Sequence, residues 1–134
     1  MKHQQEVFTM LASSPINAFV RVTDPQRARN FYEKVLGLQV VSDNPFMIVF
    51  RANNALVMAQ KAEKFSPLRG TVLGWEVKDI NKTIAALIKN GVVFERYDGM
   101  DQDELGVWKS PEGKVAWFKD PDGNILSLSE HANY

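Results

Sequence analysis

The sequence predicts an α+β fold in which two βαβββ modules form a curved mixed sheet around a cup-shaped cavity. The first observation is an internal repeat, because a pattern of one strand, one helix and three strands runs through the chain twice. Corresponding positions of the two copies lie 55 residues apart, as Val22 and Val77 do and as Asp24 and Asp79 do. The second observation is that the repeat occurs only twice, which favours two modules sharing a core over a solenoid.

Composition supports a single soluble unit. The chain has 134 residues, of which 45% are hydrophobic, and this is enough for one buried core. Its 16 basic and 16 acidic residues cancel, which argues against nucleic acid or an anionic membrane as the partner. Without cysteine, disulfides, thiol nucleophiles and Cys-ligated zinc are excluded. No apolar run approaches the roughly 20 residues of a membrane span, and residues 1–14 lack a signal-peptide pattern, so the sequence predicts a cytoplasmic protein.

The first module is predicted to cover residues 15–60, after an N-terminal arm or short helix at 1–14. In its first strand, strict alternation puts Val20 and Val22 on one apolar face. Asp24 is suited to cap the next helix, and Pro25 to occupy its first position. The predicted elements are a strand at 16–22, a helix at 24–36 and strands at 38–42, 46–52 and 55–60.

The second module is predicted to cover residues 71–130, between a linker at 61–70 and a tail at 131–134. Asp79 is suited to cap its helix, whose apolar stripe begins at Ile80 and Ile84. The stripe ends before Gly91, a residue that commonly follows a helix. The remaining predicted elements are strands at 72–77, 92–97, 105–109, 114–119 and 125–129, which is one strand more than in the first module.

Two motifs connect the predicted elements to a known family. The segment Asn30-Phe31-Tyr32-Glu33-Lys34-Val35-Leu36-Gly37-Leu38 ends the first helix, and Asp120-Pro121-Asp122-Gly123-Asn124 forms the turn of the last hairpin. With the doubled module, they resemble the vicinal oxygen chelate superfamily, which includes glyoxalase I, extradiol dioxygenases, and fosfomycin- and bleomycin-resistance proteins. The resemblance covers residues 16–130 and implies the fold predicted above.

The resemblance also implies where a metal would bind. In the metalloenzymes of this superfamily, His or Glu side chains on the first and last strands of each module hold a divalent ion in the cup. The matching positions here are Asn17, Val57, Val72 and Ser127. One amide, one hydroxyl and two valines are not the donors of a zinc, nickel or iron site. Neither a metal nor another cofactor is therefore expected, with a weak site of oxygen ligands as the alternative.

Strand alternation predicts which side chains line the cup instead. Arg21 and Glu76 occupy equivalent positions of the two modules, and two interpretations remain open for them. They form a structural ion pair, or Arg21 binds an anionic or carbonyl group with Glu76 as its partner or as a general base. The acidic segment 95–104 is a solvated loop or a lid above Trp108. The candidate ligand-binding residues are Asn17, Phe19, Arg21, Glu76, Trp108, Trp117 and Ser127, although Phe19 and Trp117 also suit a plain core.

Two functions are consistent with this site. The first is a binding protein that holds a small, flat or aromatic organic molecule in a metal-free cup, as the bleomycin-resistance branch of the family does. The second is an enzyme, such as a lyase, isomerase or dioxygenase relative, that uses a displaced metal or Glu76 as a general base. The missing metal ligands favour the first function. A homodimer is expected, because two small modules leave sheet edges and apolar surface uncovered.

Overall fold

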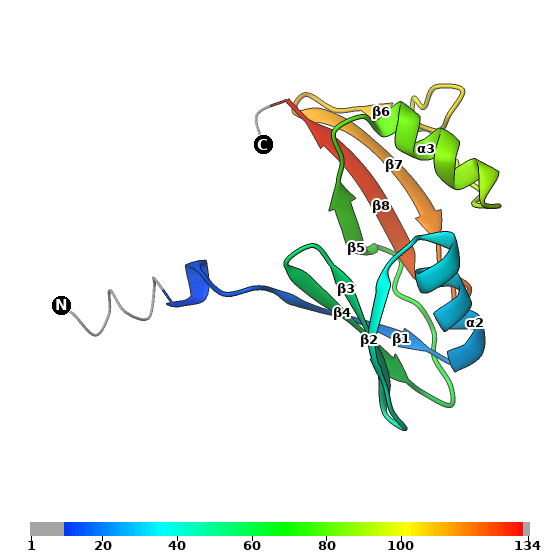
Figure 1. Cartoon of the computed structure of the whole chain (residues 1–134). Coiled ribbons are helices and arrows are strands. Elements are labelled where there is room, and N and C mark those ends of the chain that lie inside the picture. The colour runs from blue at the N-terminus through cyan, green and yellow to red at the C-terminus, as the bar shows by residue number, and fades with distance from the viewer. Residues whose placement is uncertain (1–9, 133–134) are drawn as a thin grey trace.

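The computed structural model describes residues 10–132 and has the two predicted modules in sequence order (Figure 1). A short helical turn at residues 10–12 precedes them. The first module contains β1 (Asn17–Val22), α2 (Pro25–Arg29), the π-helix η1 (Asn30–Val35), β2 (Gln39–Asp43), β3 (Met47–Ala52) and β4 (Ala55–Lys61). The second contains β5 (Thr71–Glu76), α3 (Ile80–Lys89), β6 (Trp108–Lys109), β7 (Gly113–Lys119) and β8 (Ile125–His131).

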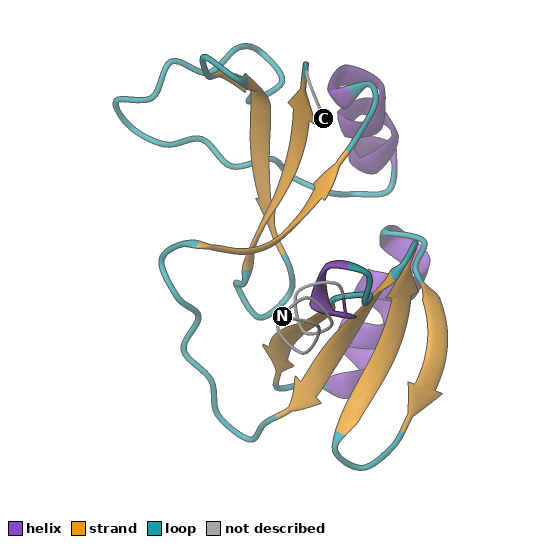
Figure 2. Cartoon of the chain, turned by 90° about the vertical axis from the view of Figure 1, so that its left-hand side faces the viewer, coloured by secondary structure: helices purple, strands orange, loops and turns teal. Residues whose placement is uncertain are grey.

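The two modules have the same sheet topology, which confirms the repeat and the predicted fold class. The strand order is β1-β4-β3-β2 in one sheet and β5-β8-β7-β6 in the other. In each sheet the first strand pairs in parallel with the last, while the other pairs are antiparallel. Figure 2 shows the two sheets one above the other. In Figure 1 the helices α2 and α3 lie on the same side of these sheets. The face of each sheet without a helix is called its open face below.

Both helices begin at the predicted caps. The Asp24 carboxylate accepts a hydrogen bond from the Arg27 N–H at 3.1 Å, and the Asp79 carboxylate accepts one from Lys82 at the same distance. The first helix differs from the prediction in its second half, which is wound as a π-helix with the Leu36 N–H donating to the Phe31 carbonyl. This wider turn contributes Tyr32 to the core, where it is fully buried.

One hydrophobic core joins the modules. Val20 and Val22 on β1 are buried, as the alternation predicts, and they belong to the same cluster as Ile80 and Ile84 on α3. Aromatic side chains cross the junction, since the Phe31 ring lies 6.5 Å from the ring of Phe118 on β7. The open faces of the two sheets are therefore held in one body.

One predicted strand is wrong and another is shorter than predicted. In place of a strand at 92–97 there is one isolated bridge, between Phe94 and Phe118, and the strand predicted at 105–109 covers only β6. In this segment, side chains form hydrogen bonds with the backbone groups that a neighbouring strand would otherwise bind. The Gln102 side chain binds the Tyr97 N–H and two carbonyls, and the Asp103 carboxylate accepts the N–H groups of Leu105 and Val107.

No helix within residues 10–132 is both long and apolar enough to cross a membrane.

Candidate functional site

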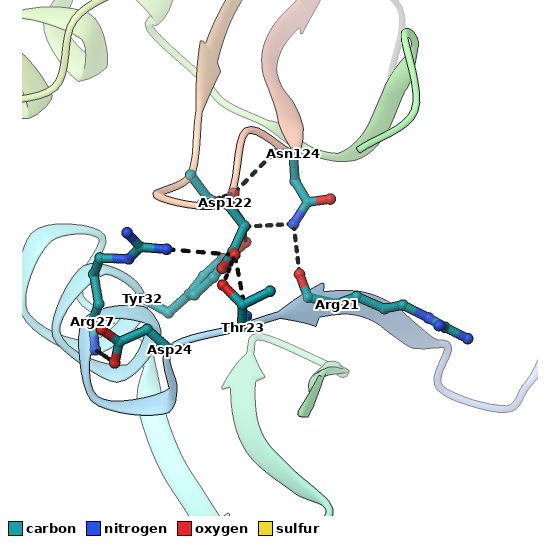
Figure 3. Close-up of polar contacts among 8 residues, drawn as sticks. Arg21, Thr23, Asp24, Arg27, Tyr32, Asp122 and Asn124 are labelled. Carbon is teal, nitrogen blue, oxygen red and sulfur yellow. Dashed lines mark hydrogen bonds and ion pairs between the residues drawn. The ribbon is translucent and has the colours of Figure 1, made fainter. Parts of the chain in front are cut away.

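The last hairpin is anchored to the first module by a buried polar network (Figure 3). Asp120, only 4% exposed, accepts hydrogen bonds from the Tyr32 hydroxyl at 2.7 Å and from the Asn124 side-chain amide at 2.8 Å. The same Asn124 amide donates to the Arg21 carbonyl at 3.0 Å. Burial, together with the Asp120 charge, raises the pKa of Tyr32 well above its ordinary value, so its hydroxyl remains a donor. The hairpin thus fixes the backbone of β1 at Arg21.

Asp122 makes a second connection between the modules. Its Oδ1 accepts the Thr23 hydroxyl at 2.5 Å and the Thr23 N–H at 3.1 Å, and lies 3.5 Å from the Arg27 guanidinium. Its Oδ2 is buried without a hydrogen-bond partner among the described residues. The hairpin that carries the family resemblance therefore serves to position β1 and α2, a role for which the sequence offers no separate signal.

The open face of the first sheet carries the predicted residues Asn17, Phe19 and Arg21. All three are exposed, and Phe19 is 53% exposed despite its apolar ring. The resemblance implied that Val57 occupies a metal-ligand position in the cup. This is wrong, because Val57 pairs with Ala18 and is only 2% exposed on the core side. Met58, which pairs with Phe19, shares the open face instead.

The open face of the second sheet contains Ser127 between Gly74 and Trp117. Gly74 on β5 pairs with Ser127 on β8, which in turn pairs with Trp117 on β7. A Cβ on Gly74 would collide with the Ser127 hydroxyl oxygen, so only glycine leaves that hydroxyl its present place. Ser127 is 8% exposed, and its hydroxyl has no hydrogen-bond partner within residues 10–132.

Three aromatic rings lie together beside Ser127. The Trp117 ring lies 5.7 Å from Tyr97 in an edge-to-face contact and 6.3 Å from Trp108 in a tilted contact. The Trp117 indole N–H donates to the Thr71 hydroxyl at 3.1 Å, which fixes the ring. We call Tyr97, Trp108 and Trp117 the aromatic corner. Through Tyr97, the segment 95–104 contacts Trp117.

Glu76 does not pair with Arg21. Its carboxylate accepts the His131 N–H at 2.6 Å and contacts the His131 Nδ1 at 2.7 Å. Burial opposes ionisation of Glu76, but these contacts outweigh it and hold the pKa of Glu76 below its usual range. The interpretation of an Arg21–Glu76 ion pair is therefore wrong. Glu76 on β5 pairs with Ser129 on β8. His131 follows Ser129 by two residues and lies on the same face of β8, which brings it next to Glu76.

Arg21 borders a small cavity, which we call the Arg21 pocket. Its volume is about 200 Å³, and the residues that line it come from β1, β4, the linker, β5 and the hairpin: Phe19, Val20, Arg21, Gln60, Phe65, Leu68, Val72 and Asn124. The Arg21 guanidinium has no ion pair or hydrogen bond within the described part of the chain. Phe65 and Leu68 were missed because they lie in the stretch interpreted only as a linker.

The positions implied for a metal do not fit one. Asn17 and Ser127 lie on the open faces of different sheets and offer one amide and one hydroxyl, while Val72 offers no donor and Val57 lies in the core. Within residues 10–132, no three His, Cys, Asp or Glu side chains are grouped as metal ligands. His3 lies outside the described residues. No chemical step through a metal follows from these residues.

The structure divides the predicted site residues into groups. It places Phe19 and Arg21 in one pocket, and Trp108, Trp117 and Ser127 around the aromatic corner. Glu76 contacts His131, the last residue of β8. Residues that the sequence reasoning missed are Gln60, Phe65, Leu68, Thr71, Tyr97 and His131. Strand alternation would have indicated Gln60, which pairs with Arg21, whereas Tyr97 carried no signal because its segment was predicted as a strand.

Comparison with known proteins agrees with this architecture. No curated protein matches the sequence. Among solved structures, a glyoxalase/bleomycin resistance protein/dioxygenase from Alicyclobacillus acidocaldarius has a TM-score of 0.69 at 15% identity, covering 90% of this chain and 93% of that one. A lactoylglutathione lyase from Agrobacterium tumefaciens has a TM-score of 0.68 at 16% identity, with coverage of 88% and 93%. TnmS3, an antibiotic binding protein from Streptomyces sp. CB03234, has a TM-score of 0.65 at 23% identity, with coverage of 90% and 97%.

At these identities, the solved structures establish the fold alone. The family is established by the sequence itself, since residues 14–128 match the model of one family. That range includes both modules and the hairpin that connects them. The chain therefore belongs to the glyoxalase/bleomycin resistance protein/dioxygenase superfamily.

Proposed function

We propose that this protein binds a small planar organic molecule on its open faces without a metal. The observation that carries the proposal is the aromatic corner next to the unpartnered Ser127 hydroxyl. Pockets for small organic molecules combine aromatic walls with a few placed polar groups. Trp117, fixed through its indole N–H, offers a ring for stacking, and Ser127 offers a hydroxyl that both donates and accepts.

Gly74 determines where the Ser127 hydroxyl lies. Because Gly74 has no side chain, the Ser127 hydroxyl oxygen occupies the space that a Cβ on Gly74 would take, in the same row of the sheet as Trp117. A planar molecule can contact Trp117 and still reach the Ser127 hydroxyl. The description of TnmS3 as an antibiotic binding protein gives this proposal a precedent within the same fold.

The alternative function, an enzyme with Glu76 as general base, has less support. A general base works best when its pKa is near the working pH. The pKa of Glu76 is instead held low, and both of its oxygens are engaged by His131.

The proposal is tested by titrating the protein with a panel of planar aromatic compounds while tryptophan fluorescence is recorded. We expect at least one compound to quench fluorescence saturably. Trp117→Leu should weaken that binding by about tenfold or more, because stacking on one aromatic ring contributes ~1–3 kcal/mol. Phe46→Leu is the matched control, since Phe46 is 77% exposed before β3 and lines none of these sites. A panel without a binder, or equal losses in both variants, would contradict the proposal.

We also propose that the protein is a homodimer. The open faces expose apolar side chains such as Phe19, and the segment before β1 projects from the body with Leu11 75% and Ile16 73% exposed (Figure 1). A second copy would bury these groups, which stabilises association in proportion to the apolar area covered. Light scattering at micromolar concentration should give twice the chain mass of 15.2 kDa. A monomer there would exclude the dimer.

A further inference from the structure

The Arg21 side chain is exposed and starts from a fixed point of the backbone. The backbone carbonyl of Arg21 is held by Asn124, which the Asp120 network orients in turn. Its side chain nevertheless has no ion pair and no hydrogen bond within residues 10–132. A guanidinium presents five N–H donors in a planar fork that matches a carboxylate in a bidentate arrangement. We infer that the Arg21 pocket binds the carboxylate group of an aromatic carboxylate ligand.

The surroundings of Arg21 favour an anion over a neutral group. No carboxylate side chain lines the pocket, and its polar members besides Arg21 are the Gln60 and Asn124 amides. Phe19, Phe65, Leu68 and Val72 form apolar walls, which lower the local dielectric constant and strengthen a charge–charge contact. Gln60 pairs with Arg21 in the β1–β4 register and also lines the pocket, so its amide can donate a further hydrogen bond to the bound carboxylate.

The pocket also has the right size and position for one end of an aromatic molecule. At about 200 Å³ it is somewhat larger than a cavity of about 150 Å³ that holds benzene, so it accommodates one ring with its carboxylate. Val72 lines the pocket, and the preceding residue Thr71 accepts the hydrogen bond of the Trp117 indole. The Arg21 pocket and the Trp117 indole therefore both border the first residues of β5. This inference rests on the proposed function and specifies its ligand as a planar aromatic carboxylate.

The test compares 2-naphthoate with 2-naphthamide, a neutral molecule of nearly the same shape, by isothermal titration calorimetry. The wild-type protein should bind the carboxylate at least about tenfold more tightly, as expected for hydrogen bonds to a charged partner. Arg21→Met should abolish the preference and leave the affinity for the amide unchanged. Arg21→Lys should retain only part of it, because an ammonium group lacks the bidentate fork.

Arg51→Met provides the matched control. Arg51 is the other arginine on the open face of the first sheet, is exposed, has no ion pair within the described residues and does not line the pocket. The carboxylate preference should survive this change. Equal affinities for the two compounds, a preference that survives Arg21→Met, or equal losses in both methionine variants would overturn the inference. Failure of both compounds to bind would also overturn it, whereas a neutral compound that quenches Trp117 fluorescence would leave the proposed function standing.

Discussion

Replacing Tyr32 by Phe removes one hydroxyl from the network that joins the modules. Tyr32 is fully buried, and its hydroxyl donates to Asp120 at 2.7 Å. The change leaves the ring in place and deprives the Asp120 carboxylate of one of its four donors, the others being the N–H groups of Asp122 and Asn124 and the Asn124 side chain. A hydrogen bond to a charged group contributes ~1.5–3 kcal/mol, so the free energy of unfolding should fall by that amount.

For a chain of this length, such a loss corresponds to a melting temperature lower by roughly 5–10 °C. Thermal and urea denaturation followed by circular dichroism measure it. Tyr97→Phe is the matched control, because the Tyr97 hydroxyl has no hydrogen bond within residues 10–132. Its melting temperature should stay within about 2 °C of the wild-type value, which corresponds to the ±0.5 kcal/mol typical of surface changes. A Tyr32→Phe variant as stable as Tyr97→Phe would refute the reasoning that Asp120 holds the modules together.

Two further predictions concern the second sheet. Gly74→Ala should lower the free energy of unfolding by about 1–3 kcal/mol and weaken ligand binding, since its Cβ displaces the Ser127 hydroxyl. Adding Ser127→Ala should restore stability but not binding. If the stability losses of the two single variants simply add in the double variant, as measured by urea denaturation, the reasoning is contradicted. The low pKa of Glu76 means that the folded state binds fewer protons than the unfolded one, so its stabilisation is present above pH about 4.5 and is lost as pH falls through the lowered value. Glu76→Gln should therefore flatten the acid limb of a stability–pH profile, and an unchanged limb would count against the contact with His131.

Those parts of the fold that depend on local pattern were predictable. The caps at Asp24 and Asp79 and the buried alternation at Val20 and Val22 follow from neighbouring residues alone. The strand at 92–97 was not predictable, because the Gln102 side chain takes backbone groups that alternation assigns to a sheet. This competition depends on a loop whose shape the sequence does not reveal.

The site was predicted in part. Alternation put Phe19, Arg21 and Trp117 on the open faces, whereas the resemblance put a metal-ligand position of the cup at Val57, one residue before Met58 on the open face. The two-residue turn between β3 and β4 pairs Ala52 with Ala55, and this register sends Val57 to the core. The repeat suggested Glu76 as the partner of Arg21. In the structure, the pairing of β5 with β8 brings Glu76 next to His131, and these two side chains contact each other instead.

The central claim, that a planar ligand binds beside the aromatic corner, is tested most directly by the tryptophan indole signals in a two-dimensional ¹H–¹⁵N NMR spectrum. The chain has three tryptophans, and the structure puts Trp108 and Trp117 in the aromatic corner while Trp75 packs in the core, stacked 6.4 Å from Phe118. Addition of a binder from the aromatic panel should shift the indole signals of Trp108 and Trp117 and leave that of Trp75 in place. A shift confined to Trp75, or saturable binding that moves none of the three signals, would contradict the account.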